Sequence, residues 1–186
     1  MTTFMPRIKS VEAEKPATLK LEWKPEVTVA GTGHSDIATL IQNMPVSRVD
    51  LTGWIATGGE ALASLTNWVA FACVKPIEYN SAVAWDDDGD IAIDAYHLWK
   101  LAEEQKPFTS EDAAAWQKAV RMSNSEIADF FNISVSSWNA YKAGAAIPPA
   151  IGMACRAAQR DPLLIEAHWR PRKSGRPRKS EQESAT

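Results

Sequence analysis

The sequence has 186 residues, of which 45% are hydrophobic and 23% charged, with eight tryptophans and a formal net charge of −3. This length accommodates one ordinary domain or two small ones, and the apolar content excludes a collagen, a mucin-like stalk or a wholly disordered chain. The longest apolar run, residues 68–74, has seven residues, whereas a membrane-spanning helix needs about 20.

The charges are unevenly distributed along the chain. Residues 1–106 contain 9 Lys+Arg and 15 Asp+Glu, a net of −6, while residues 107–186 contain 11 and 8, a net of +3. Residues 170–179 hold six of these basic residues and no acid. Such an asymmetry suggests an acidic module joined to one that meets a polyanion. With no signal-peptide pattern at the N-terminus, we expect a soluble cytoplasmic protein.

The first half predicts a small α+β domain over residues 7–106. Short alternating segments on either side of Pro16 are typical of a half-buried hairpin, and Asn80 and Ser81 favour a turn. A linker with Pro107 should end this domain. The expected elements are hairpin strands at 7–14 and 17–24, a short helix at 36–42, a strand at 48–55, a helix running into a strand at 60–74, β-structure after Pro76 and a helix at about 94–104.

The second half predicts an all-α domain over residues 107–168. Thr109 or Ser110 should cap its first helix, and Ser123 with Glu126 forms a capping box for the second. Asn132 suits a left-handed turn, and a basic tail at 169–186 is expected to be disordered when alone. The predicted helices run from the first cap to about 121, over 124–131 and 135–142 with Ser134 as cap and Gly144 as stop, and from Pro148 and Pro149 to about 161.

Residues 122–144, MSNSEIADFFNISVSSWNAYKAG, contain the parts of a helix-turn-helix. Ala128 allows two helices to approach closely, and Ile133 follows the turn as an apolar plug. Ile127, Phe131, Trp138 and Tyr141 can fill the space between the helices, leaving Val135, Ser136, Ser137, Asn139 and Ala140 outward. The segment resembles the helix-turn-helix of the Cro/C1 (lambda-repressor-like) family at Met122-Ser123-Asn124, Glu126-Ile127-Ala128, Asn132 and Ile133-Ser134. The alternative is a plain helical bundle with a polar face.

The resemblance implies that the helix starting near Val135 enters the major groove of double-stranded DNA, with a homodimer on half-sites one helical turn apart. Asn124 stands where family members carry a phosphate-binding glutamine. Without an arginine on this helix, Asn139 could read adenine and Val135 or Ala140 a thymine methyl, which favours an A·T-leaning or shape-dependent site. The predicted DNA-binding residues of this domain are Asn124, Ser134, Val135, Ser136, Ser137, Asn139, Ala140 and Lys142.

The tail segment KSGRPRK (173–179) resembles an AT-hook, in which a Gly-Arg-Pro core lies extended in a narrow minor groove. Ser174 stands where that core usually has arginine. The resemblance implies minor-groove or phosphate contacts, and the alternative is a solvated tail that adds only non-specific, salt-sensitive affinity. The predicted contact residues are Arg172, Lys173, Arg176, Arg178 and Lys179.

The acidic half resembles domain-of-unknown-function family 2442, which occurs ahead of helix-turn-helix domains. The resemblance rests on VDLTGW (49–54), ALASLTNWVAFACV (61–74) and AVAWDDDGDIAI (82–93). The family has no settled activity. We expect a sensor, dimerisation or partner-binding role with a protein partner or small effector; the alternative is a purely architectural role.

Several residue patterns resemble a metal-binding or catalytic site but lack the spacing or residues that such a site requires. The acidic run 86–90 fails as a calcium loop, because placing Gly89 sixth puts Ala84 and Ala95 where carboxylates are required; a solvated β-turn is expected instead. His34, His97 and His168 are widely separated, which predicts no metal site. Cys73 and Cys155 have no sequence-local activating base and should be reduced thiols. We expect no cofactor and no catalysis.

Together these features predict a sequence-specific DNA-binding transcriptional regulator of bacterial type. The alternative is an antitoxin-like or other interaction module, in which the acidic half binds a partner protein and DNA binding serves autoregulation. Neither the operator sequence nor the sign of regulation follows from the sequence.

Overall fold

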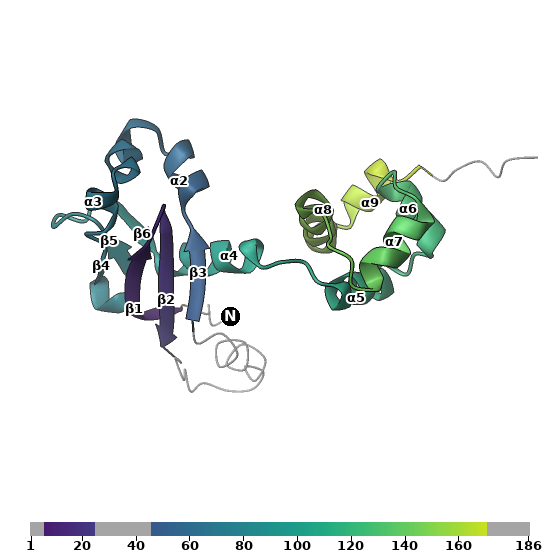
Figure 1. The fold of residues 1–186 in the computed structure, drawn as a ribbon, viewed down its shortest axis with the longest axis horizontal. Helices are drawn as coiled ribbons and strands as arrows, with labels where there is room; N and C mark the ends of the chain where they lie inside the picture. Colours follow the sequence, from purple (N-terminus) through teal and green to yellow (C-terminus); the bar gives the residue numbers. More distant parts are fainter. Residues whose placement is uncertain (1–5, 25–45, 171–186) are drawn as a thin grey trace, which may run out of the picture. The chain divides into compact units, whose positions relative to one another are not determined.

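The computed structural model describes residues 6–24 and 46–170, in a chain that divides into two compact units between Lys106 and Pro107 (Figure 1). The first unit combines helices with two small antiparallel sheets, and the described part of the second contains helices. The protein is therefore α+β. The helix predicted at 36–42 and the tail contacts at Arg172, Lys173, Arg176, Arg178 and Lys179 lie outside the described residues.

The first sheet consists of β1 (Arg7–Glu14), β2 (Thr18–Lys24) and β3 (Val46–Asp50), in that order and antiparallel. The predicted hairpin is confirmed by the β1–β2 pairing. Because side chains alternate along a strand, Leu19, Leu21 and Trp23 of β2 share the buried face. The indole N–H of Trp23 donates to the Ser47 hydroxyl at 2.8 Å, which satisfies a polar pair inside this core.

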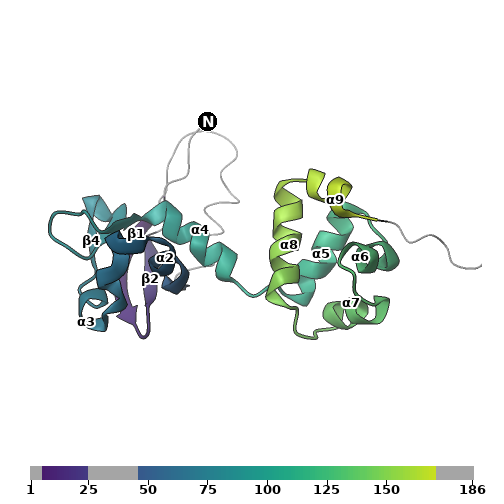
Figure 2. The ribbon, with the colours of Figure 1, turned by 90° about the horizontal axis from the view of Figure 1, so that it is seen from above.

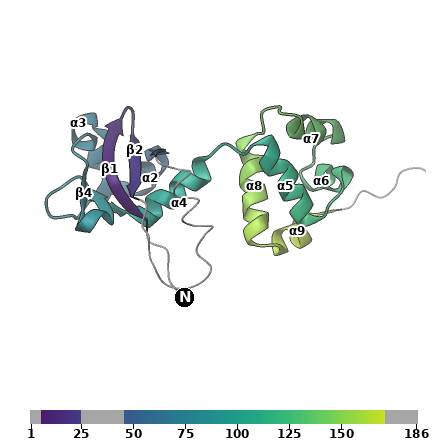
Figure 3. The ribbon, with the colours of Figure 1, turned by 90° about the horizontal axis from the view of Figure 1, so that it is seen from below.

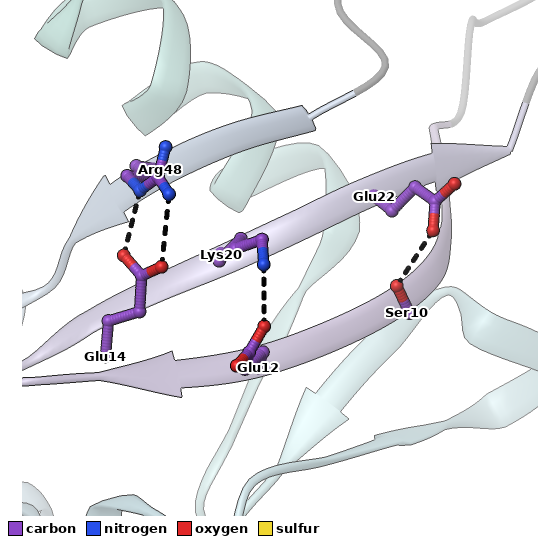
Figure 4. A network of polar contacts seen from close by, with 6 residues as sticks. All are labelled: Ser10, Glu12, Glu14, Lys20, Glu22 and Arg48. Carbon is purple, nitrogen blue, oxygen red and sulfur yellow. Dashed lines mark hydrogen bonds and ion pairs between the residues drawn. The ribbon is translucent and has the colours of Figure 1, made fainter.

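The opposite face of the first sheet carries a ladder of paired charges (Figure 4). Arg48 donates from Nε and Nη2 to the two carboxylate oxygens of Glu14, at 2.9 and 3.3 Å. Lys20 pairs with Glu12 at 2.8 Å, and hydrogen bonding to that ammonium, followed by its charge, lowers the pKa of Glu12. Glu22 accepts from Lys9 and Ser10. These acids and bases neutralise one another across the strands.

Helices and a second sheet complete the first unit. The strand expected at 48–55 ends at Asp50, because the Asp50 carboxylate accepts the amide N–H of Thr52 at 2.8 Å and turns the chain into a helix. The helix running into a strand that was expected at 60–74 is met only in part, since the first helix ends before the extended Asn67, which caps a separate short helix. The elements are α2 (Thr52–Thr57), η1 (Gly59–Thr66), α3 (Trp68–Phe71), β4 (Lys75–Ile77), η2 (Glu78–Asn80), β5 (Ala82–Ala84), β6 (Ala92–Asp94) and α4 (Ala95–Gln105).

One core lies between the buried face of the first sheet, the second sheet (order β4-β5-β6) and α4. Phe71 and Leu98 are fully buried within it. Gln105, the last residue of α4, exchanges two hydrogen bonds with the backbone of Asp50, at 2.8 and 2.7 Å. This pairing fixes the end of α4 to the end of β3.

The second unit contains α5 (Ser110–Val120), α6 (Asn124–Phe130), α7 (Val135–Lys142), α8 (Pro149–Arg160) and α9 (Leu163–His168) (Figures 2 and 3). The caps predicted at Thr109, Ser123 and Ser134 are confirmed. The sequence analysis missed α9, a six-residue helix that starts after Pro162 and whose first turn is supported by the Asp161 carboxylate.

The core of this unit gathers large rings around small residues. Trp138 is fully buried, with ring centroids 6.1 Å from Trp116 and 6.0 Å from Phe131. Helix α8 packs closely because Gly152 has no side chain: a Cβ there would lie 2.7 Å from the Cβ of Phe108. The buried side of α7 thus packs against aromatic rings of α5 and of the segment that follows α6.

Candidate nucleic-acid interface

Helices α6 and α7 are joined by a short turn at residues 131–134. Asn132 in this turn has φ +52°, a left-handed conformation that asparagine tolerates better than most residues. The amide N–H of Ile133 donates to the Ala128 carbonyl at 2.9 Å, which closes the end of α6. Ala128 is buried, as expected for a small residue between two close helices.

Hydrogen bonds between Ser123 and Glu126 fix where α6 begins. The amide N–H of Ser123 donates to Glu126 at 2.7 Å, and Glu126 N–H donates back to the Ser123 hydroxyl at 3.3 Å. This amide, followed by the Ser123 hydroxyl, holds the pKa of Glu126 below its usual value of 4.5. The stability that the ionised Glu126 carboxylate adds to the folded state is therefore complete above pH 4.5. It is lost as the pH falls and the carboxylate is protonated.

The outward surface of α7 is composed of short side chains. Ser136, Asn139 and Ala140 are exposed, and Val135 is 42% exposed. We call these four residues the α7 strip. The expectation that Ser137 also points outward is only partly met, because it is half-buried and lies 2.7 Å, Oγ to Oγ, from Ser134. Ser134 itself is exposed and also contacts the Ser136 hydroxyl at 2.7 Å.

A chain of amide groups runs beneath and beside the α7 strip. Gln117 of α5 accepts the indole N–H of Trp138 at 3.0 Å and donates through Nε2 to Asn124 Oδ1 at 2.8 Å. Asn124 donates through Nδ2 to Asn139 Oδ1, also at 2.8 Å. The chain connects three helices of the second unit and ends on an exposed residue of the strip. Gln117 was not predicted from the sequence, because it lies 21 residues before Trp138 and its neighbours in the sequence do not indicate the contact.

Asn124 and Lys142, both predicted as DNA contacts, are half-buried and bonded to each other. The Lys142 ammonium donates to Asn124 Oδ1 at 2.8 Å. Asn124 therefore serves three neighbours in the free protein, rather than standing open for a phosphate. The residues that the structure brings together are Gln117, Asn124, Trp138, Asn139 and Lys142.

The sequence contains two further candidate sites, the acidic run at 86–90 and the cysteines Cys73 and Cys155. The Asp86 carboxylate accepts the amide N–H groups of Gly89 and Ile91, at 2.8 and 2.9 Å, as in a solvated turn. Among residues 6–24 and 46–170, no three His, Cys, Asp or Glu side chains gather as metal ligands. Burial raises the pKa of Cys155 to about 12, so this thiol stays protonated at neutral pH, whereas Cys73 is exposed.

Comparison with known proteins adds little to this geometry. No protein-family model matches the chain, and no curated protein matches it. A crystal structure of a Nitrosomonas europaea protein named "putative DNA binding protein" is similar, with 23% identity and a TM-score of 0.41, over 91% of this chain and 96% of that one. The resemblances to the Cro/C1 family and to unknown-function family 2442 stay predictions. Within the described segments, no helix is long and apolar enough to span a membrane.

Proposed function

We propose that the chain binds double-stranded DNA sequence-specifically as a transcriptional regulator, with α6 and α7 as a helix-turn-helix and α7 in the major groove. The observation that carries this proposal is the α7 strip: exposed short side chains on a helix whose other face is anchored by the buried Trp138. The Asn, Ser, Val and Ala side chains of such a surface offer hydrogen-bonding groups and methyl groups that can contact base edges in the major groove.

The charge distribution of the second unit also supports DNA binding through α7. Helix α7 contains no acidic residue and ends on Lys142. The first turns of α5 and α6 hold acids, Glu111 and Asp112 in one and Glu126 in the other, whereas the first turn of α7 has only hydroxyl groups. The backbone N–H groups and hydroxyls at that end are compatible with a phosphate. The basic residues at 170–179 would add attraction to the DNA backbone.

A single copy of α7 is too short to specify an operator. At 1.5 Å per residue an eight-residue helix is about 12 Å long, which spans only about three or four base pairs. We therefore propose that the protein binds as a homodimer. DNA selected from a random pool should contain two copies of one short motif, with centres about 10 base pairs or a multiple apart. Recovery of a single unrepeated motif by the full chain would contradict the dimer.

The role of α7 is tested by replacing Asn139 with alanine. The variant loses the longest polar side chain of the strip, and we expect discrimination at one base-pair position to fall by about 1–3 kcal/mol while binding to random DNA is retained. The measurement is selection from a random pool, followed by titration of the selected duplex and its single-base variants.

Gln159→Ala provides the matched control. It removes the same type of amide from an exposed position on α8, and it should leave discrimination at every position unchanged. If Asn139→Ala selects the same site with the same discrimination as the parent, α7 does not read bases and the proposed docking is wrong.

A further inference from the structure

The amide chain under the α7 strip has a defined hydrogen-bond direction. Each of its amides could be turned to exchange oxygen and nitrogen, but its fixed partners permit only one arrangement. The Trp138 indole can only donate, so the Gln117 atom facing it at 3.0 Å must be the oxygen. The Gln117 nitrogen then faces the Met122 carbonyl at 3.0 Å, which can only accept.

The orientation of Gln117 in turn determines the orientations of Asn124 and Asn139. Asn124 presents its oxygen to the Gln117 nitrogen, and the Lys142 ammonium, which can only donate, lies 2.8 Å from the same oxygen. The Asn124 nitrogen must therefore face Asn139, which receives it with Oδ1 at 2.8 Å. The remaining polar atom of Asn139 is its Nδ2 donor, and the residue is exposed.

We infer that Gln117, acting through Asn124, is a positioning residue that makes Asn139 a hydrogen-bond donor toward the base edge. This inference rests on the proposed function. The base atoms it selects are major-groove acceptors: purine N7, guanine O6 or thymine O4. The bidentate adenine contact expected from the sequence needs in addition that the Asn139 oxygen, which already accepts from Asn124, use its second lone pair to accept from adenine N6.

Reversing the direction of these hydrogen bonds is unfavourable at each of the three amides. Turning Asn139 alone would set its NH₂ group against the NH₂ group of Asn124. Turning all three amides would set the Gln117 nitrogen against the Trp138 indole N–H, and the Gln117 oxygen against the Met122 carbonyl. Each arrangement leaves like groups facing one another with their hydrogen bonds unmade. The Trp138 indole, the Met122 carbonyl and the Lys142 ammonium thus together determine which atom Asn139 has left to present.

The test is Asn124→Asp in the full chain. An aspartate is the same size and can still accept from Gln117 and Lys142, but it cannot donate to Asn139. Asn139 should therefore turn, donating through Nδ2 to the new carboxylate and presenting Oδ1 outward. Ser125→Asp is the matched control, because it adds the same charge to an exposed position on α6.

The first measurement needs no DNA. In an NMR spectrum of the ¹⁵N-labelled full chain, the side-chain NH₂ of Asn139 should exchange several-fold more slowly with water in Asn124→Asp than in the parent. In Ser125→Asp it should exchange as in the parent. Equal exchange in all three proteins would overturn the inference whether or not the protein binds DNA.

The second measurement is selection of bound DNA by the same three proteins. At the position that Asn139→Ala relaxes, Asn124→Asp should change the preferred base from an acceptor to a donor at the contacted atom, cytosine N4 or adenine N6, by about three- to tenfold. Ser125→Asp should lower affinity without changing the preferred base. If Asn124→Asp keeps the parent's preferred base, as Ser125→Asp should, the positioning of Asn139 through Asn124 is wrong while the proposed function stands. If the parent selects no sequence, the inference and the proposed function both fail.

Gln117→Glu tests the origin of the direction. Glutamate retains an acceptor for the Trp138 indole but has no donor for Asn124. Combined with Lys142→Met, which removes the ammonium that also holds the Asn124 oxygen in place, it should let the Asn124 nitrogen turn inward, so that Asn139 presents its oxygen as in Asn124→Asp. The double variant should share the exchange and base-preference changes of Asn124→Asp. If it folds with the parent's helical content and keeps the parent's preference, Gln117 does not set the direction.

Discussion

Replacing Trp138 with alanine should unfold the second unit or bring it close to unfolding. The side chain is fully buried, contacts the rings of Trp116, Phe131 and Tyr141, and donates to Gln117. Truncating a buried tryptophan costs about 3–5 kcal/mol, a large share of the stability of a small domain. We expect a loss of far-ultraviolet circular dichroism at 222 nm and of DNA binding at temperatures where the parent retains both.

Two further variants test whether the unfolding depends on the buried side chain of Trp138. Trp138→Phe keeps one ring in the core but loses part of the indole volume as well as the bond to Gln117, so it should cost less than Trp138→Ala and leave the unit folded. Met153→Ala removes an apolar side chain that is 62% exposed on α8 and should change stability by less than about 0.5 kcal/mol. A Trp138→Ala protein that melts like Met153→Ala would contradict the assigned core.

The helices of the second unit were predictable because their ends depend on neighbouring residues. Ser123 and Glu126 lie three apart and satisfy each other's backbone groups, so a capping box can be identified from the sequence alone. Asn132 likewise marks the turn by its own tolerance of positive φ. The same reasoning placed Pro149 in the first turn of α8.

Local signals also misled where side-chain hydrogen bonds competed with the strand or helix pattern. Apolar residues on both sides of Asp50 favoured a single strand over 48–55, but the Asp50 carboxylate accepts from Thr52 N–H and starts a helix. Asn67 breaks the segment at 60–74 in the same manner. Aspartate and asparagine provide such local alternatives to regular structure, and which one forms depends on tertiary packing.

The candidate site was predictable in its surface but not in its support. Exposure of Val135 and Asn139 follows from helical periodicity once Trp138 is assigned to the core. The relation of Gln117 to Trp138 and Asn124 depends instead on how α5 packs against α6 and α7, and no spacing rule reports it. The phosphate contact of Asn124 stays a prediction, whereas the bonds of its oxygen to Gln117 and Lys142 could not be predicted from the sequence.

Deleting residues 170–179 should produce the largest change in DNA affinity. The segment carries six cations and no acid, and each cation that neutralises a phosphate adds about 0.9 to the slope of log K against log salt. With all six on phosphates, the slope should flatten by about 5. The parent's advantage over the deletion should then fall by about a thousandfold between 50 and 200 mM salt. The loss should be similar on selected and random DNA, measured by fluorescence anisotropy across a salt series.

Two further proteins identify the cause of that loss. Deleting residues 180–186, which contain no basic residue, shortens the chain without removing a cation and should leave the slope unchanged. Replacing Gly175 with serine and Pro177 with alanine keeps all six cations but removes the residues that an extended minor-groove segment requires. If this variant loses affinity for A·T-rich duplexes alone, the tail acts as the AT-hook resemblance implies. If it binds every duplex like the parent, the tail acts through charge. A deletion of 170–179 with the parent's slope would contradict both.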